Sequence, residues 1–306
     1  MLREVFIGLS ENQSLRHFAE RSPLGLKMSR RFVAGTTIEE LIQATETVNK
    51  LGIHASVDNL GENVTNREEA VASARVYHQL LDEIERRKLD VNVSLKLTHM
   101  GLDVDEKLAR QVVTELVEHA ARIQNFIRVD MEGSAYTQRT LDFVRELHRQ
   151  PGCAGRVGTV LQAYMHRTMD DAKLLVSEGI RIRLCKGAYK EPPEIAFQAK
   201  PEVDANYVRV AKYLLKGGVF HGLATHDEAI ITEIKNWAKA EGITPGAFEF
   251  QMLHGIRRDL QEQLAREGWG VRVYIPFGTE WYPYFMRRLA ERPANVWFIT
   301  KNLLRG

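Results

Sequence analysis

The chain has 306 residues, of which 44% are apolar and 27% charged, a composition typical of a folded globular protein with a sizeable core. Its 42 basic and 40 acidic residues leave a net charge of +2, which excludes the strongly basic surface that nucleic-acid binding requires. The two cysteines, Cys153 and Cys185, follow no disulfide or metal-ligand spacing, so we expect a reducing, cytoplasmic setting and no metal site.

The apolar runs are all short compared with the roughly 18 to 20 residues of a membrane-spanning helix, so the sequence predicts a soluble protein. Lys27, Arg30 and Arg31 form a small basic group near the N-terminus. Such a group is usually solvated surface, but it also allows peripheral contact with the inner face of the cytoplasmic membrane.

Helical patterns at residues 10–20 and 36–51 open the chain. No low-complexity linker follows them. We therefore expect residues 1–50 to form helical segments that pack on a single catalytic domain of residues 51–306.

Eight short runs rich in strand-forming residues follow in chain order. They span residues 53–58, 91–97, 126–132, 157–163, 180–186, 219–225, 247–252 and 270–276. Longer amphipathic segments separate them, among them 66–88, 105–123, 202–216 and 227–240. This alternation predicts parallel strands joined by crossover helices.

A closed barrel and an open doubly wound sheet both fit the alternation, and the strand faces distinguish them. In the run 91–97 every second residue is apolar, whereas Asn92, Ser94 and Lys96 share the other face. Strands covered by helices on both sides should be apolar on both faces. Because nearly all the runs have one polar face, we predict an α/β fold of the (β/α)8 TIM-barrel type, in which the polar faces meet inside the barrel.

The predicted lumen collects about one polar residue from each strand. The set is Asp58, Lys96, Asp130, Glu132, Gln162, Arg183, Thr225, Gln251 and Tyr274. A network of satisfied ion pairs is possible for any one of them. A whole lumen of such residues is expected mainly where a ligand or water occupies it, because unpaired buried charge is costly.

The last predicted helix carries Tyr284, Arg287, Arg288 and Glu291 at helical spacing on one face. This stripe is either the solvated side of an outer helix or a clamp for a carboxylate, which arginine binds through two parallel hydrogen bonds. If it is a clamp, the helix has to lie over the carboxyl-end mouth of a distorted barrel.

Several segments resemble the successive signatures of the monofunctional, FAD-dependent proline dehydrogenase family. They are RFVAG (31–35), LGE (60–62), SLKLTHMG (94–101), RVDMEGS (128–134), RLCKGAY (183–189), ATHD (224–227), FEFQMLHG (248–255), YIPFG (274–278) and YFMRRLAE (284–291). The resemblance covers nearly the whole chain. It implies an oxidoreductase of proline catabolism that converts L-proline to Δ1-pyrroline-5-carboxylate by hydride transfer to FAD.

The resemblance also implies a substrate site. Arg287, Arg288 and Lys96 are expected to hold the substrate carboxylate, with Glu62 paired to Arg287. An apolar slot around the pyrrolidine ring would be formed by Tyr284, Tyr189, Leu253 and Ala188. Tyr274 would crowd the far carbon of the ring, which favours proline over hydroxyproline.

For FAD the resemblance implies Arg183 near the flavin N5 and Gln162 at the ring. The complete expected cofactor set is Asp130, Gln162, Arg183, Lys186, Gly187, Ala188, Thr225, His226 and Glu291. No GxGxxG follows a strand, so the cofactor would lie on the barrel and not on a Rossmann domain. Gly187 would let the backbone approach the cofactor closely. Lys190 departs from the family pattern, since many relatives have an aromatic residue there that stacks on adenine.

Lys96, Asp130, Arg183 and Tyr274 are the expected catalytic residues. Asp130, Lys96 and bound water all remain candidates for the base that keeps the proline amine neutral. The resemblance implies a quinone as electron acceptor and a separate pyrroline-5-carboxylate dehydrogenase for the product. Two other functions stay open: a Schiff-base lyase or aldolase with Lys96 as nucleophile, and a catalytically inactive barrel that serves as a binding protein.

Overall fold

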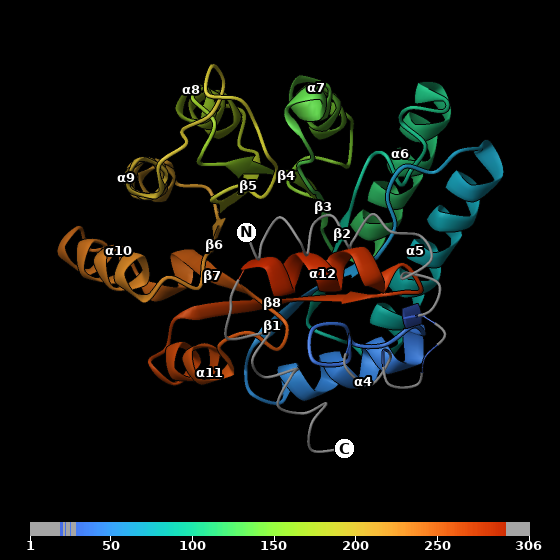
Figure 1. Ribbon diagram of the computed structural model, residues 1–306, viewed down its shortest axis with the longest axis horizontal. Helices are drawn as coiled ribbons and strands as arrows, with labels where there is room; N and C mark the ends of the chain where they lie inside the picture. The colour runs from blue at the N-terminus through green and yellow to red at the C-terminus, as the bar shows by residue number, and fades with distance from the viewer. Residues whose placement is uncertain (1–18, 21, 23–24, 26–28, 292–306) are drawn as a thin grey trace.

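The structure, a computed structural model, describes residues 19, 20, 22, 25 and 29–291, with the side chains of 287 and 289–291 excepted. It is a closed barrel of eight parallel strands in sequential order, surrounded by helices (Figure 1). The strands are β1 (His54–Asn59), β2 (Val91–Leu95), β3 (Ile127–Val129), β4 (Val157–Gln162), β5 (Arg181–Cys185), β6 (His221–Ala224), β7 (Phe248–Leu253) and β8 (Gly270–Phe277). All eight predicted strands are therefore confirmed, and so is the barrel.

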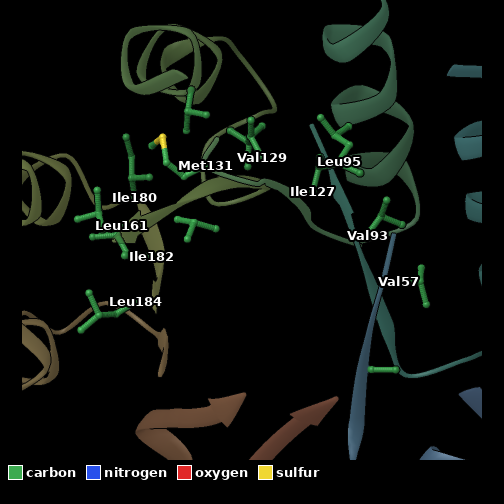
Figure 2. Packing of buried hydrophobic residues seen from close by; sticks show 14 of the residues in the cluster. Val57, Val93, Leu95, Ile127, Val129, Met131, Leu161, Ile180, Ile182 and Leu184 are labelled. Atoms are coloured by element: carbon green, nitrogen blue, oxygen red, sulfur yellow. The ribbon is translucent and has the colours of Figure 1, made fainter. Parts of the chain in front are cut away.

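The helices between the strands are α5 (Arg67–Arg87), α6 (Glu106–Arg122), α7 (Ser134–Arg149), α8 (Thr168–Ser177), α9 (Lys200–Lys216), α10 (Glu228–Ala240) and α11 (Arg258–Arg266), with a short 3-10 turn at Pro245–Ala247. Their apolar stripes face the strands. Figure 2 shows Val57, Val93 and Leu95 among the residues of this layer. The main hydrophobic core is thus a shell between strands and helices, which leaves the lumen to the polar faces.

Two helices occupy positions that differ from those in a regular (β/α)8 barrel. α4 (Ile38–Asn49) packs against both β1 and β8, the place where a helix following β8 would normally lie. Its start is fixed by a capping box of Thr37 and Glu40. α12 (Trp281–Glu291), which does follow β8, instead lies across the barrel (Figure 1). The predicted position of the last helix over the mouth is confirmed.

The N-terminal predictions are tested only in part. The helix expected at 36–51 is α4, whereas the one expected at 10–20 lies outside the described residues except for residues 19 and 20, which are helical. Lys27 lies outside them as well. The division into residues 1–50 and 51–306 stays a prediction. No helix in the described part of the chain combines the length and apolarity that crossing a membrane requires.

His221 gives the fold a pH-dependent stability. Its Nδ1 accepts the backbone N–H of Ile182 at 3.1 Å inside the barrel wall, and burial, together with Arg128 and Arg181, lowers the pKa of His221 to about 3. As the pH falls below 6.5, the unfolded chain binds a proton that the folded chain does not. Folding stability is therefore lost on acidification.

We expect His221→Asn, whose amide oxygen can replace Nδ1 as acceptor, to lose about 2 kcal/mol less stability between pH 7 and pH 5 than the unaltered chain. Denaturant unfolding at the two pH values measures this difference, and any uniform destabilisation of the variant cancels. Identical pH dependence of the two proteins would show that His221 is not the responsible group.

Candidate active site

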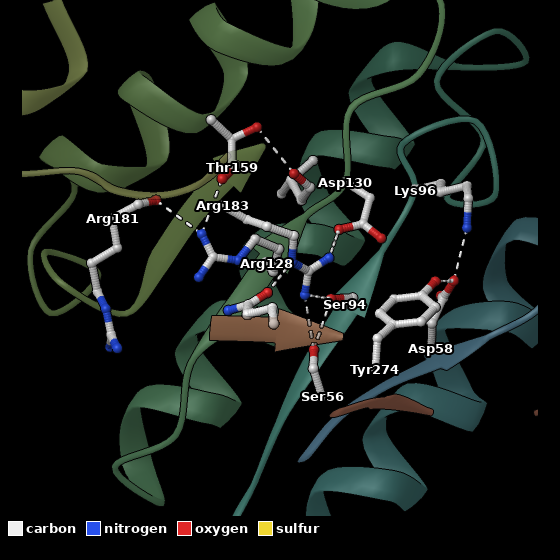
Figure 3. Close-up of polar contacts among 12 residues, drawn as sticks. Ser56, Asp58, Ser94, Lys96, Arg128, Asp130, Thr159, Arg181, Arg183 and Tyr274 are labelled. Carbon is white, nitrogen blue, oxygen red and sulfur yellow. Dashed lines mark hydrogen bonds and ion pairs between the residues drawn. The ribbon is translucent and has the colours of Figure 1, made fainter. Parts of the chain in front are cut away.

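The polar faces of the strands meet in the lumen around Arg183. Its guanidinium donates to Asp130 at 2.7 Å, to the side-chain oxygen of Gln251 at 2.6 Å and to the hydroxyls of Ser56 and Ser94 at 3.1 and 3.0 Å (Figure 3). Arg183 is 7% exposed. Partners from β1, β2, β7 and the end of β3 thus fix a single orientation of this cation in the barrel.

A second centre forms around the carboxylate of Asp58, which is fully buried. It accepts hydrogen bonds from Lys96 Nζ at 2.8 Å, from the Tyr77 hydroxyl at 2.9 Å and from the Tyr274 hydroxyl. Asp58 was predicted to face the lumen but was given no function. In the structure it positions two of the predicted catalytic residues, Lys96 and Tyr274.

The charges around Lys96 determine its protonation state. Burial acts to lower the pKa of Lys96, but the carboxylates of Asp58, Glu62 and Asp130 outweigh it and raise that pKa above its ordinary value. Lys96 is therefore an ammonium ion at neutral pH. An ammonium ion can bind a carboxylate, but it cannot act as a base or as a Schiff-base nucleophile, both of which need the free amine.

The pKa values of two neighbouring acids, Asp130 and Tyr274, are raised as well. Burial raises the pKa of Asp130, while Arg183 and Lys96 partly oppose this effect. Burial, the charge of Asp58 and the hydrogen bond to it raise the pKa of Tyr274 well above its usual range, so Tyr274 keeps its proton and remains a donor. Of the two side chains considered as base, only Asp130 remains.

The lumen is polar below this level as well. Gln251 donates to Glu249 at 2.6 Å, and Glu249 accepts from Arg272 at 2.7 Å, so hydrogen bonds continue from Arg183 toward the amino ends of the strands. Arg128 donates to the carbonyl oxygens of Thr159 and Arg181 in the same layer. Most of these groups find partners within the protein, as a structural network of ion pairs would, but Arg128 Nε and one carboxylate oxygen of Glu249 are buried without a hydrogen-bond partner.

α12 closes the barrel mouth with an apolar surface. Trp281, Tyr282, Tyr284, Phe285 and Met286 are each at most 6% exposed, and they pack with Leu60 and Ile256 in one cluster. Leu253 and Tyr274, from the carboxyl ends of β7 and β8, pack against this cluster. Tyr284 is buried and Arg288 is partly buried, so the described part of the predicted stripe does not face solvent as the outer side of a surface helix would.

Arg288 follows Tyr284 by one turn. Its guanidinium carbon lies 5.0 Å from the centre of the Tyr284 ring, and the side chain is partly buried. The side chains of Arg287 and Glu291 lie outside the described residues, so the pairing of Arg287 with Glu62 is untested. The charge of Glu62 contributes to the raised pKa of Lys96.

The residues expected to hold the flavin follow β4, β5 and β6. Gln162 is 4% exposed and donates to the carbonyl oxygen of Glu132, and Thr225 is 6% exposed. His226 Nε2 accepts the backbone N–H of Leu253 at 2.9 Å, so the neutral ring carries its proton on Nδ1. Ala188 and Tyr189 are exposed, Tyr189 by 38%, and their part in the ring slot stays a prediction.

Gly187 and Lys186 have structural roles of their own. Gly187 has φ +115°, and a Cβ there would lie 2.4 Å from the Tyr164 ring, so packing against Tyr164 already requires glycine. This reason differs from the close cofactor approach that we predicted. Lys186 pairs with Asp204 at 2.5 Å and with Asp227 at 3.0 Å. A phosphate would have to compete with these two carboxylates for Lys186, and the placement of a flavin ring at Gln162 and Arg183 stays a prediction.

Comparison with known proteins decides the family. The family model for proline dehydrogenase matches residues 41–301. The chain belongs to the proline dehydrogenase family. It is 39% identical to proline dehydrogenase 1 of Bacillus subtilis subsp. natto over 305 residues, which is all of both chains, and 38% identical to the proline dehydrogenase of Deinococcus radiodurans over 100% of this chain and 99% of that protein.

Comparison with solved structures supports this family assignment. Proline utilization A from Bdellovibrio bacteriovorus, inactivated by N-propargylglycine, superimposes with a TM-score of 0.83 at 25% identity. The match covers 95% of this chain and 36% of that longer one. Proline dehydrogenase activity, with proline as substrate and dependence on a flavin, therefore describes this chain as it does its family.

The sequence left several important residues without a role. Tyr77 on α5 and Tyr164 after β4 were assigned no role from the sequence, yet one orients Asp58 and the other packs on Gly187. Asp204 and Asp227, which hold Lys186, were also missed. A usable signal existed only for Asp227, which belongs to the ATHD segment.

Proposed function

We propose that this member of the family oxidises L-proline to Δ1-pyrroline-5-carboxylate with FAD as its cofactor. The observation that carries the proposal is the placement of two cations at the mouth. Lys96 is held as an ammonium ion by Asp58, and Arg288 lies on the helix that covers the barrel. Both are suited to a carboxylate, and the apolar surface of Tyr284 and Leu253 is suited to a pyrrolidine ring.

The protein's part in the reaction is to bind and to orient. Lys96 and Arg288, with Arg287, would hold the carboxylate, and Tyr274 and Tyr284 would limit the space for the ring. A bound flavin supplies the acceptor for the hydride that leaves C5 of proline. Gln162 and Arg183 would hold its ring, with Asp130, Lys186, Gly187, Ala188, Thr225, His226 and Glu291 as further contacts.

The proline amine must be neutral so that its lone pair can drive out the hydride. Since the pKa of Lys96 is raised, we propose that Lys96 binds and does not deprotonate. Asp130 or a water molecule takes the amine proton. A raised pKa makes Asp130 a better proton acceptor than an ordinary aspartate, although its ion pair with Arg183 limits this role.

The electrons then pass to a quinone, and the cyclic imine is consumed by a separate pyrroline-5-carboxylate dehydrogenase. A quinone dissolved in the lipid bilayer would require peripheral contact with the inner face of the cytoplasmic membrane. This location agrees with the absence of a spanning helix from the described residues.

Turnover with an artificial acceptor tests the proposal. We expect the purified protein to reduce a redox dye in the presence of L-proline and to yield the cyclic imine. Borohydride added with a carbonyl substrate should leave Lys96 unmodified, because an ammonium ion forms no Schiff base. A borohydride-stable adduct on Lys96 without dye reduction would instead establish the lyase.

Tyr274 is expected to determine selectivity against hydroxyproline. We predict that Tyr274→Ser shifts the ratio of kcat/KM values for hydroxyproline and proline by about 10- to 100-fold toward hydroxyproline, since a removed steric clash is worth roughly 1–3 kcal/mol. Tyr274→Phe is the matched control, because it loses the hydrogen bond to Asp58 and keeps the ring. Equal selectivity in Tyr274→Ser and the unaltered enzyme would refute the steric role.

A further inference from the structure

A cavity of about 420 Å³ lies at the end of the barrel opposite α12. Its walls come from the end of α5 and the loop after it, from the first residues of β2 and β5, from the first half of β8, and from the loops that precede β3 and β4. Lys96 and Tyr274 lie toward the other ends of their strands. The cavity is therefore distinct from the proposed proline site.

One wall of the cavity is cationic. Arg156, Arg181 and Arg272 all line it. Arg272 is 8% exposed and is held in place by Glu249 at 2.7 Å and by the carbonyl oxygen of Ala55 at 2.5 Å. Arg272 is thus a preorganised cation whose own counterion lies in the lumen.

Arg181 and Arg156 differ from Arg272 in having no carboxylate partner among the described residues. The guanidinium of Arg181 is stacked between Phe126 at 4.5 Å and Phe220 at 4.9 Å, and its Nε is buried without a hydrogen-bond acceptor. Figure 3 shows the side chain of Arg181 extending away from the network of Arg128 and Arg183. Burial lowers the pKa of Arg181, and repulsion from Arg272 and Arg156 adds to this effect, although Glu249 opposes it.

A further buried polar group lines the cavity. Asn92 is 6% exposed, and its side-chain oxygen has no hydrogen-bond partner. Buried polar groups are nearly always satisfied, so an unsatisfied one at a cavity wall indicates that a ligand or ordered water completes the site. By turning its amide, Asn92 can offer either a donor or an acceptor.

The apolar part of the lining comes from Ile84, Leu89, Ile123 and Phe126. The remaining charged residues at the cavity are Lys88, Glu85 and Asp90, all exposed. Asp90 pairs with His54 at 2.5 Å. Glu249 neutralises Arg272, so Arg156, Arg181 and Lys88 remain against Glu85 and Asp90, which leaves the lining with a net positive charge.

We propose that this cavity is a second binding site, for a small organic anion whose carboxylate or phosphate contacts Arg156, Arg181 and Asn92 and whose apolar body lies on Phe126 and Ile123. Arginine binds both kinds of anion through paired N–H groups. A single inorganic ion would fill little of the volume, which is in the range of small-molecule sites. The site does not depend on the function proposed above.

Calorimetric titration of the flavin-loaded protein with phenyl phosphate and with benzoate tests the site, and the two probes separate a phosphate ligand from a carboxylate ligand. We expect saturable binding of at least one probe, and at least about tenfold weaker binding of neutral benzamide. Arg181→Met and Arg156→Met should each weaken binding by about tenfold or more. Arg156 precedes β4 in a loop, so its variant remains informative if Arg181→Met does not fold.

Two controls locate the binding. Arg75→Met makes the same substitution at an exposed position of α5 away from the cavity and should leave the affinity unchanged. Arg288→Met alters the proline site and should also leave it unchanged. The proposal is overturned if neither probe binds up to about 10 mM, if both cavity variants bind like the unaltered protein, or if only Arg288→Met abolishes binding.

Discussion

Replacing Arg288 by Met is expected to raise KM for proline by about 100- to 1000-fold, because the substrate carboxylate loses a charge-assisted, two-pronged partner worth roughly 3–4 kcal/mol. Methionine matches the aliphatic stem of arginine up to Nε and can still pack beside the Tyr284 ring, whose centre lies 5.0 Å from the guanidinium carbon of Arg288. The lid formed by α12 should therefore remain in place. The flavin content of the purified variant should be unchanged.

Steady-state kinetics with L-proline measure this effect. Arg266→Met is the matched control, since Arg266 is 70% exposed on α11 and its loss should leave KM within about twofold. Arg288→Lys retains the positive charge but lacks the paired N–H donors of arginine. Its KM should therefore lie between those of Arg288→Met and Arg266→Met. If Arg288→Met keeps the KM of the unaltered enzyme, Arg288 does not bind the carboxylate.

Replacing Asp58 by Asn is expected to be the most damaging change in the lumen. Asp58 is fully buried and accepts from Lys96, Tyr77 and Tyr274, so its loss leaves the ammonium of Lys96 without its nearest counterion. Breaking a buried ion pair in this way costs about 3–5 kcal/mol. We also expect the pKa of Lys96 to fall and KM for proline to rise, because Lys96 is no longer held at the mouth.

Tyr77→Phe provides the control for this prediction. It removes one hydrogen bond from the same carboxylate without changing any charge, so it should cost only about 1 kcal/mol. Denaturant unfolding gives the stability difference, and the kinetic assay gives KM. Equal stability losses in Asp58→Asn and Tyr77→Phe would contradict the view that Asp58 chiefly neutralises Lys96.

The barrel could be predicted from the sequence because successive residues of each strand face different surroundings and differ in polarity accordingly. Ser94 and Lys96 alternate with Val93 and Leu95, and only a closed barrel brings all such polar faces together. The position of α12 could not be predicted from the polarity pattern in the same way. Its pattern alone fitted an outer helix equally well, and the family resemblance decided between the two arrangements. Physically, α4 occupies the place on β1 and β8 that α12 leaves.

The site was predicted as a set of residues but not as a network. Periodicity shows that Asp58, Lys96 and Tyr274 face the lumen, yet it does not show which of them touch. Pairing depends on the stagger of neighbouring strands and on side-chain length, as with Lys96 reaching Asp58 across β1 and β2. Tyr77 joins that pair from a helix and has no sequence signal of its own.

The central claim is that cations at the barrel mouth present proline to a flavin held by the same barrel. The visible absorbance spectrum of the purified protein, recorded without oxygen before and after L-proline is added, tests it most directly. We predict flavin bands that bleach with L-proline in the unaltered enzyme and, at the same proline concentration, bleach far less in Arg288→Met. A colourless protein that binds no added FAD, or a flavin whose bands persist with saturating proline, would contradict the claim.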